Sequence, residues 1–172
     1  MLKRARFRPV LLLPVLALSL IAFSPVTSAS SLDNRAAIGE LEQIKAVYDV
    51  RKSNPNALEV YLRAIRSNVE NLEREGVTAD LVMVFISHSV KFINTAPTLE
   101  VEADYGPALE RIAEHVRELQ DMGVRMEACN GATRAFNVDN DTLLPGIEPV
   151  RSGFISLMGY QNNGYALVPV YD

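Results

Sequence analysis

Three side chains that can take part in chemistry stand where apolar runs of the sequence end. Cys129, the only cysteine among 172 residues, closes the run "VRMEAC" directly before a predicted helix start. His88 follows "ADLVMVFIS", and Asp49 lies near the end of "QIKAVYDV". The free N–H groups and the dipole of a helix start favour a thiolate, which is a nucleophile. The pattern therefore indicates thiol chemistry at Cys129, with His88 or the helix amides tuning the sulfur.

Each of these residues also has a purely structural interpretation. A lone cysteine is commonly a small buried hydrophobe, and His88 can simply bond backbone at the start of a short helix. His115 lies at the edge of an apolar helical stripe and is expected on the solvated face. Two histidines and one cysteine far apart in sequence match no metal-ligand spacing, so neither a metal nor a cofactor is expected. The sequence also lacks a P-loop and a Gly-x-Ser-x-Gly elbow.

The elements that must position these residues alternate between strand and helix patterns. Strands are predicted over 43–50, 79–87, 124–129 and 165–171, and the connection 141–149 can hold a short edge strand. Pro169 limits the last strand to an edge or a strand end. Helices are predicted from the N-cap Asn54 to Gly76 and from Gly106–Pro107 to Gly123, with shorter ones over 88–94, 130–137 and 150–164.

This alternation predicts an α/β domain of three layers: an open, mainly parallel sheet of four to five strands with helices on both faces. Sites in such sheets collect beyond the carboxyl ends of the strands. We therefore expect Cys129, His88 and Asp49 to share one edge of the sheet.

The first 29 residues have the pattern of a secretory signal peptide. Four basic residues precede the apolar run "PVLLLPVLALSLIAF", and Thr27 and Ala29 suit the −3 and −1 positions of a cleavage site. The alternative is a membrane anchor, but a spanning helix needs about 20 apolar residues. We expect a signal peptide over 1–29, a leader over 30–42, one domain over 43–172, and a periplasmic or secreted protein with no stable membrane anchor after cleavage.

Charge limits the partners of the mature chain. The sequence has 17 basic and 21 acidic side chains, and loss of the four signal cations leaves 13 basic ones, a net charge near −8. This balance argues against a nucleic-acid surface. A single cysteine excludes an internal disulfide, even in an oxidising compartment.

Nearly the whole mature chain resembles the DsrE/DsrF-like family, α/β domains associated with sulfur relay. The similar segments are, in order, "KAVYDV", "AIRSNVENLEREGV", "ADLVMVFISHS", "MGVRMEACNGATRAF" and "PVRSGFISLMGYQNNGYALVPV". Cys129 matches the family cysteine that follows a strand of the form Gly-Val-x-x-x-x-Cys. The resemblance implies a persulfide on Cys129, passed to a partner protein, and assembly into trimers or hexamers. The relay proteins act inside the cell, whereas this chain has an export pattern, so the sulfur donor and acceptor are not implied.

Two functions remain open from the sequence. The first is an exported sulfur carrier or sulfurtransferase-like protein that uses Cys129 as its persulfide site. The second is a non-enzymatic oligomeric protein that binds a small ligand or has a structural role, with an incidental cysteine. The apolar tail "FISLMGYQNNGYALVPVY" favours a homo-oligomer in both cases, because large exposed apolar patches mark interfaces.

Overall fold

The computed structural model describes residues 32–172, so the predicted signal peptide lies outside the described residues. Its elements are α1 (Arg35–Ile38), β1 (Gln43–Val50), α2 (Pro55–Arg74), β2 (Thr78–Phe85), the 3-10 helix η1 (Ser87–Phe92), α3 (Leu99–Asp121), β3 (Arg125–Cys129), α4 (Asn130–Ala135), the 3-10 helix η2 (Asn140–Thr142), β4 (Ile147–Val150), α5 (Gly153–Asn162) and β5 (Ala166–Val170). Within residues 32–172, none of the helices is both long and apolar enough for a membrane span.

The strands form one sheet in the order β4-β3-β2-β1-β5, and every neighbouring pair is parallel. This confirms the predicted α/β class and the upper estimate of the strand number. The segment 141–149 does contribute an edge strand, β4. Pro169 lies in the other edge strand, β5, where its missing N–H is tolerated.

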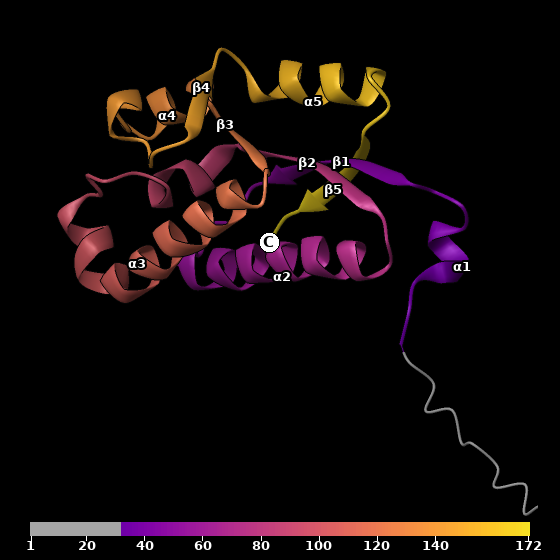
Figure 1. Cartoon of the computed structure of the whole chain (residues 1–172). Helices are drawn as coiled ribbons and strands as arrows, with labels where there is room; N and C mark the ends of the chain where they lie inside the picture. Colours follow the sequence, from indigo (N-terminus) through magenta and orange to yellow (C-terminus); the bar gives the residue numbers. More distant parts are fainter. Residues whose placement is uncertain (1–31) are drawn as a thin grey trace, which may run out of the picture. The chain divides into compact units, whose positions relative to one another are not determined.

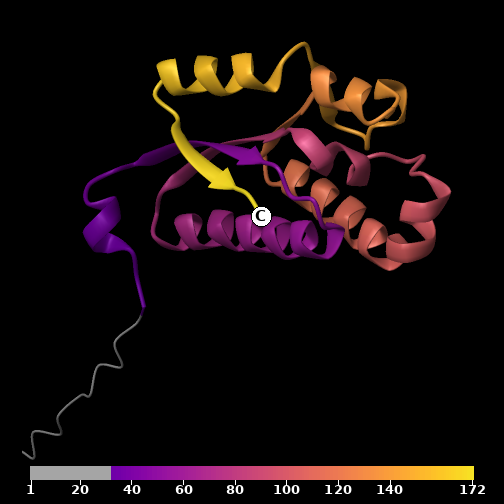
Figure 2. The same ribbon diagram turned by 180° about the vertical axis from the view of Figure 1, so that it is seen from behind.

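Helices cover both faces of the sheet. Figure 1 shows α2 and α3 side by side below the strands, with α5 and α4 above them. The view from behind shows the same separation of the helices into two layers (Figure 2). The helix α5 contacts β1, β2 and β3, and α4 contacts β3 and η1. The predicted three-layer arrangement is therefore present.

The face under α2 and α3, which we call the α2/α3 face, forms a large part of the apolar core. Strand residues alternate between faces, and Tyr48, which contacts Asn68 of α2, marks this one. Met83 pairs with Tyr48, and Phe85 is two residues farther along β2, so both lie on this face, where they are fully buried. The helix α2 adds an apolar stripe and begins at the predicted N-cap, because the Asn54 side chain accepts from the N–H groups of Asn56 and Ala57.

The start predicted for α3 is wrong. The helix begins at Leu99, not at Gly106–Pro107, and Pro107 lies inside it. The Thr98 hydroxyl accepts from the N–H of Val101 and caps the helix, and acidic side chains in the first turn suit the helix dipole. Burial of Val101 against the core keeps the added turns helical despite the proline.

The expectation for His115 is also wrong. Its side chain is only 12% exposed, because it lies between α2 and α3. Its Nδ1 is 3.0 Å from Glu118 Oε2, and its Nε2 is 3.4 Å from Glu59 Oε1. The bond from His115 lowers the pKa of the Glu118 carboxyl, although partial desolvation opposes this. Glu59 of α2 is itself buried, and its carboxylate gives the imidazole a polar partner between the two helices.

Candidate site at the carboxyl edge of the sheet

The strand register places Arg51, Ile86 and Cys129 in one row. Val50 pairs with Phe85, and Phe85 pairs with Ala128, so the three residues that follow lie side by side across β1, β2 and β3. Neighbouring strands are about 4.8 Å apart. The Cα atoms of Arg51 and Cys129 are therefore about 10 Å apart, with Ile86 between them.

All three side chains of this row point to the face under α5, which we call the α5 face. Gly153, the first residue of α5, lies directly over the row. A Cβ on Gly153 would be 2.8 Å from Ile86 Cδ1 and 3.1 Å from Cys129 Cβ. The backbone of α5 approaches the sheet this closely only because residue 153 has no side chain.

Cys129 is a buried residue. Its exposed fraction is 5%, and it directly precedes the short helix α4. On that side, a Cβ on Gly131 would lie 3.5 Å from Cys129 Sγ. Backbone at the starts of two helices thus lies close to Cys129, and its predicted position at the end of the strand is confirmed. The structure shows a thiol that is covered, so any reagent must displace this cover.

Asp49, which was also predicted at this edge, lies two positions before Arg51 on the same face. It is buried, and the Arg51 guanidinium donates to both of its oxygens, with Nε–Oδ1 and Nη2–Oδ2 distances of 2.8 Å. The hydroxyl of Tyr171 also donates to Oδ2, at 2.6 Å. The bond to Asp49 raises the pKa of Arg51 and the pKa of Tyr171. Asp49 is therefore an anchor for Arg51 and not a free base.

Two aromatic rings flank the Arg51 guanidinium. The Phe154 ring of α5 has its centroid 5.0 Å away, and the Tyr171 ring 5.2 Å away. The tail that carries Tyr171 is fixed to the loop after β1, because Lys52 donates to the Tyr171 carbonyl and Asp172 accepts from the N–H of Ser53. These contacts hold the guanidinium at the carboxyl edge, with its side chain 31% exposed.

His88 lies at the same edge in η1, but it has other contacts. Its ring is exposed and stacks on Phe136 at 4.6 Å, and its Nδ1 is 3.2 Å from Ser87 Oγ. In residues 32–172 no hydrogen bond joins it to Cys129. Ser87 has a φ of 62°, a left-handed conformation that turns the chain out of β2 into η1. A role for His88 in tuning the thiol stays a prediction.

A second polar cluster of the same composition lies on the α5 face nearer the amino ends of the strands. Arg125 Nη2 lies 2.7 Å from both Asp80 Oδ1 and Tyr165 Oη, and the Tyr165 hydroxyl donates to Asp80 Oδ2. Burial favours the protonated Asp80, but the bonds from Tyr165 and Arg125 outweigh it and lower the pKa of Asp80. This Arg–Asp–Tyr group repeats the one at Arg51, without a cysteine in its row.

Between the two clusters, the Tyr160 hydroxyl of α5 donates to Glu127 Oε1 at 2.6 Å. Burial, together with this carboxylate, raises the pKa of Tyr160 to about 12. Throughout the described residues no group of three His, Cys, Asp or Glu side chains is arranged to hold a metal ion. The chemistry that the edge offers is that of a covered thiol with a fixed guanidinium on the same face.

Sequence reasoning missed Arg51, Tyr171 and Gly153. One signal was present in "YDVRK": Asp49 and Arg51 are two residues apart at a strand end, so they share a face. Tyr171 joins them only because β5 pairs with β1. The closeness of Gly153 to Cys129 depends on the path of α5 over the sheet, which no local pattern specifies.

Comparison with known proteins agrees with this architecture. The DsrE/DsrF-like family model matches residues 43–170. An uncharacterized protein of Aquifex aeolicus (strain VF5) is 27% identical over 127 residues, which cover 73% of this chain and 56% of that protein. The chain thus spans about half the length of this relative.

Two solved structures share the fold. The protein of unknown function MTH1491 from Methanobacterium thermoautotrophicum matches with a TM-score of 0.56 at 25% identity, over 73% of this chain and 98% of that chain. The ychN protein from E. coli matches with a TM-score of 0.54 at 15% identity, over 75% of this chain and 99% of that chain. These likenesses confirm the predicted fold and assign no activity.

Proposed function

Because this chain belongs to the DsrE/DsrF-like family, we propose that it is an exported sulfur carrier in which Cys129 holds a persulfide. The observation that carries the proposal is the position of Cys129: the only thiol of the chain ends β3 at the carboxyl edge, inside the segment that the family model matches. Sites of parallel sheets collect at this edge. Arg51 lies on the same face and in the same row, two strands away from Cys129.

The transfer step is a displacement on a sulfane sulfur. The Cys129 thiolate attacks the terminal sulfur of an inorganic polysulfide, a new S–S bond forms, and the adjacent S–S bond of the donor breaks. The electron pair of the broken bond leaves on the shortened polysulfide, and Cys129 becomes a persulfide anion. Attack by an acceptor thiolate on the outer sulfur then restores the Cys129 thiolate. No external oxidant or reductant is needed, because each step is an exchange between thiolate and sulfane sulfur.

Access to the sulfur requires movement of its cover. Gly131 and Gly153 bring helix backbone close to Cys129, and α5 is a single short helix whose contacts are spread over four strands. Lifting the first turn of α5 exposes the thiol without disturbing the α2/α3 face. The persulfide is then carried in a site that is closed to water between transfers.

A homo-oligomer is part of this proposal. The exposed surface of α5 includes Phe154, Ile155 and Met158, which are 53%, 59% and 56% exposed. A helix that is apolar on both sides is typical of a buried element, and such an exposed patch is typical of an interface. The partner proposed for this patch is a second copy of the chain, in a trimer or hexamer, with the sulfur donor or acceptor protein binding at the carboxyl edge.

A second function, ligand binding with an incidental cysteine, is favoured by one observation: Cys129 is 5% exposed. A cavity of about 620 Å³ beside β3 and β4, lined by side chains that include Gln120, Glu127, Glu148 and Tyr160, offers a place for a small ligand. In this function the thiol is a packing residue only.

Mass spectrometry separates the two functions. The reduced protein is incubated with inorganic polysulfide, freed of excess reagent and weighed, with Cys129→Ser as the control. A sulfur carrier gains one sulfur atom, about 32 Da, that maps to the peptide of Cys129 and is lost on reduction. The same mass gain in Cys129→Ser, or no gain in the wild type, refutes the sulfur-carrier function.

A further inference from the structure

The guanidinium of Arg51 is the cation that the fold presents to Cys129. The two residues share a row and a face of the sheet, two strand spacings apart. The bond to Asp49 is the main cause of the raised pKa of Arg51, and the charge interaction with Cys129 is the smallest of the causes. Gly153 touches the sulfur-bearing residue, and its neighbour Phe154 touches the guanidinium.

We infer that Arg51 is a positioning residue for the chemistry of Cys129, with a guanidinium that stabilises the thiolate and the persulfide anion. This inference deepens the proposed sulfur-carrier function and rests on it. The anchoring of Arg51 fits the role, because the two bonds to Asp49 fix the guanidinium on the face that Cys129 shares.

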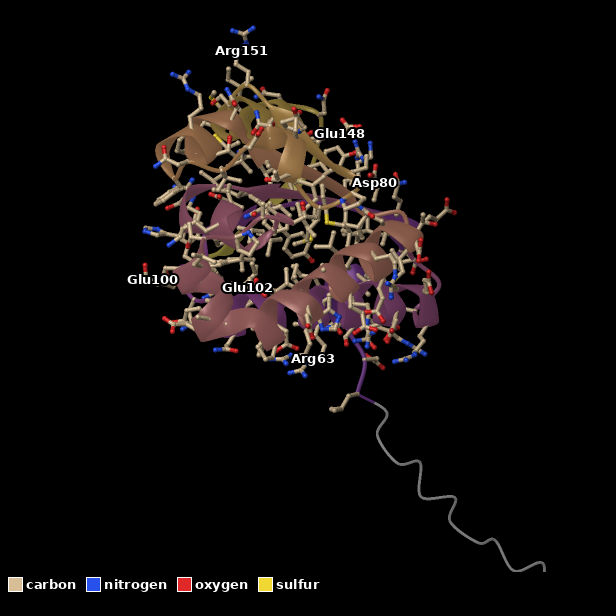
Figure 3. All side chains as sticks on the ribbon, turned by 90° about the vertical axis from the view of Figure 1, so that its left-hand side faces the viewer. Arg63, Asp80, Glu100, Glu102, Glu148 and Arg151 are labelled. Carbon is tan, nitrogen blue, oxygen red and sulfur yellow. The ribbon has the colours of Figure 1, made fainter. Side chains whose placement is uncertain are left out.

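The other charged side chains near this edge either contact other partners or point away from Cys129. Glu127 shares the face of Cys129 two residues back, and it accepts from Tyr160. His88 in η1 stacks on Phe136 and is exposed. Arg134 of α4 is exposed, and Figure 3 shows Arg151, just before α5, pointing away from the molecule. Of these cations, Arg51 alone shares both a row and a face of the sheet with Cys129.

The Arg125 cluster provides a matched control. Arg125 has the same kind of partners as Arg51, a carboxylate and a tyrosine hydroxyl, and lies on the same face. It is four residues before Cys129, at the other end of β3. Its removal takes one positive charge from the same face at a greater distance from the sulfur. If the Cys129 titration midpoint differs between the Arg51 and Arg125 variants, the cause is therefore the position of the lost charge and not the change in net charge.

The test is an NMR pH titration of the ¹³Cβ shift of Cys129 in the full domain with ¹³C-labelled cysteine. This shift follows ionisation of the thiol and needs no reagent to reach the sulfur. Arg51→Met is expected to move the midpoint upward by about one pH unit relative to wild type, whereas Arg51→Lys keeps it within about 0.3 unit. Arg125→Met is expected to leave it within the same margin. If Arg51→Met does not fold, Arg51→Gln, whose amide can still bond Asp49, replaces it.

Coinciding midpoints in the wild type and in the neutral Arg51 variant overturn the inference. Equal upward shifts in Arg51→Met and Arg125→Met also overturn it, because they reveal an effect of net charge alone. Failure of the proposed function has another signature: the wild type gains no sulfur from polysulfide, whatever the titration shows. If Arg51→Met shifts the Cys129 midpoint but the wild type forms no persulfide, the electrostatic coupling between the two residues stands. Its use in sulfur transfer is then rejected.

Discussion

The two faces of the sheet are built differently. The α2/α3 face is covered by two long helices of 20 and 23 residues and packs apolar side chains such as Met83 and Phe85. The α5 face is covered mainly by one helix of 10 residues. Its strands carry two Arg–Asp–Tyr clusters, the Tyr160–Glu127 pair and Cys129.

This difference separates stability from function. Buried apolar area stabilises by about 25 cal/mol per Å², so the side chains packed under the two long helices of the α2/α3 face contribute strongly to folding. Exposed or partly exposed ion pairs contribute about 0–1 kcal/mol each. The partly exposed Arg125–Asp80 pair therefore adds little stability, whereas Asp49 is buried and depends on Arg51 as its partner.

The largest effect is expected on the α2/α3 face. Met83→Ala removes a fully buried side chain and leaves a cavity, so the free energy of unfolding should fall by about 2–5 kcal/mol. Arg125→Met on the α5 face should lower it by less than about 1 kcal/mol, because the Arg125 side chain is half exposed. Urea unfolding measures both. Equal losses in the two variants contradict the division between the faces.

The next effect is expected where α5 meets the sheet. Gly153→Ala places a Cβ 2.8 Å from Ile86, so overpacking should lower the unfolding free energy by about 1–3 kcal/mol. Gly159→Ala is the control in the same helix, since no atom lies within 4 Å of its Cβ position. That substitution should stabilise by about 0.5–1 kcal/mol through helix propensity. Thermal unfolding that ranks the two in the opposite order refutes the close contact.

A smaller effect is expected at high pH. The pKa of Tyr160 is raised to about 12 in the folded protein, so the neutral phenol is the form that folding favours. Its contribution is complete below pH 10.0 and is lost as the pH rises toward about 12. Tyr160→Phe should cost about 1 kcal/mol at neutral pH, through the lost bond to Glu127, and make the alkaline fall in stability less steep. A variant with an unchanged alkaline slope excludes Tyr160 as its source.

The smallest effect on stability of the folded chain is expected on the outer side of α5. Ile155→Glu places a charge on the exposed patch and should change the unfolding free energy of the monomer by less than about 0.5 kcal/mol. Light scattering should nevertheless show that the variant is smaller than the wild-type assembly. A wild type that is monomeric at micromolar concentration contradicts the proposed homo-oligomer.

Sequence patterns predicted the fold well because its strands and helices are locally encoded. The run "ADLVMVFIS" is apolar because β2 is central and covered on both faces, and Asn54–Pro55 signals the start of α2 through capping alone. The start of α3 was missed because a Gly–Pro pair imitates a helix start, whereas burial of Val101 decides the matter.

The site was predicted less completely for the same physical reason. The ends of β1 and β3 are visible in the sequence, so Asp49 and Cys129 could be placed on one edge. The burial of Cys129 depends on the backbone of α5, and the anchor of Arg51 depends on Tyr171 at the far end of the chain. Such tertiary contacts have no signal in local periodicity.

Alkylation of Cys129 in the native protein tests the central claim most directly. The folded protein is treated with iodoacetamide at neutral pH without denaturant, and labelling of the Cys129 peptide is followed by mass spectrometry, with Cys129→Ser as the blank. A sulfur carrier whose α5 cover opens is labelled in full under native conditions, and its labelled form no longer takes up sulfur from polysulfide. Labelling that occurs only in denaturant shows that Cys129 is a core residue and contradicts the sulfur-carrier function.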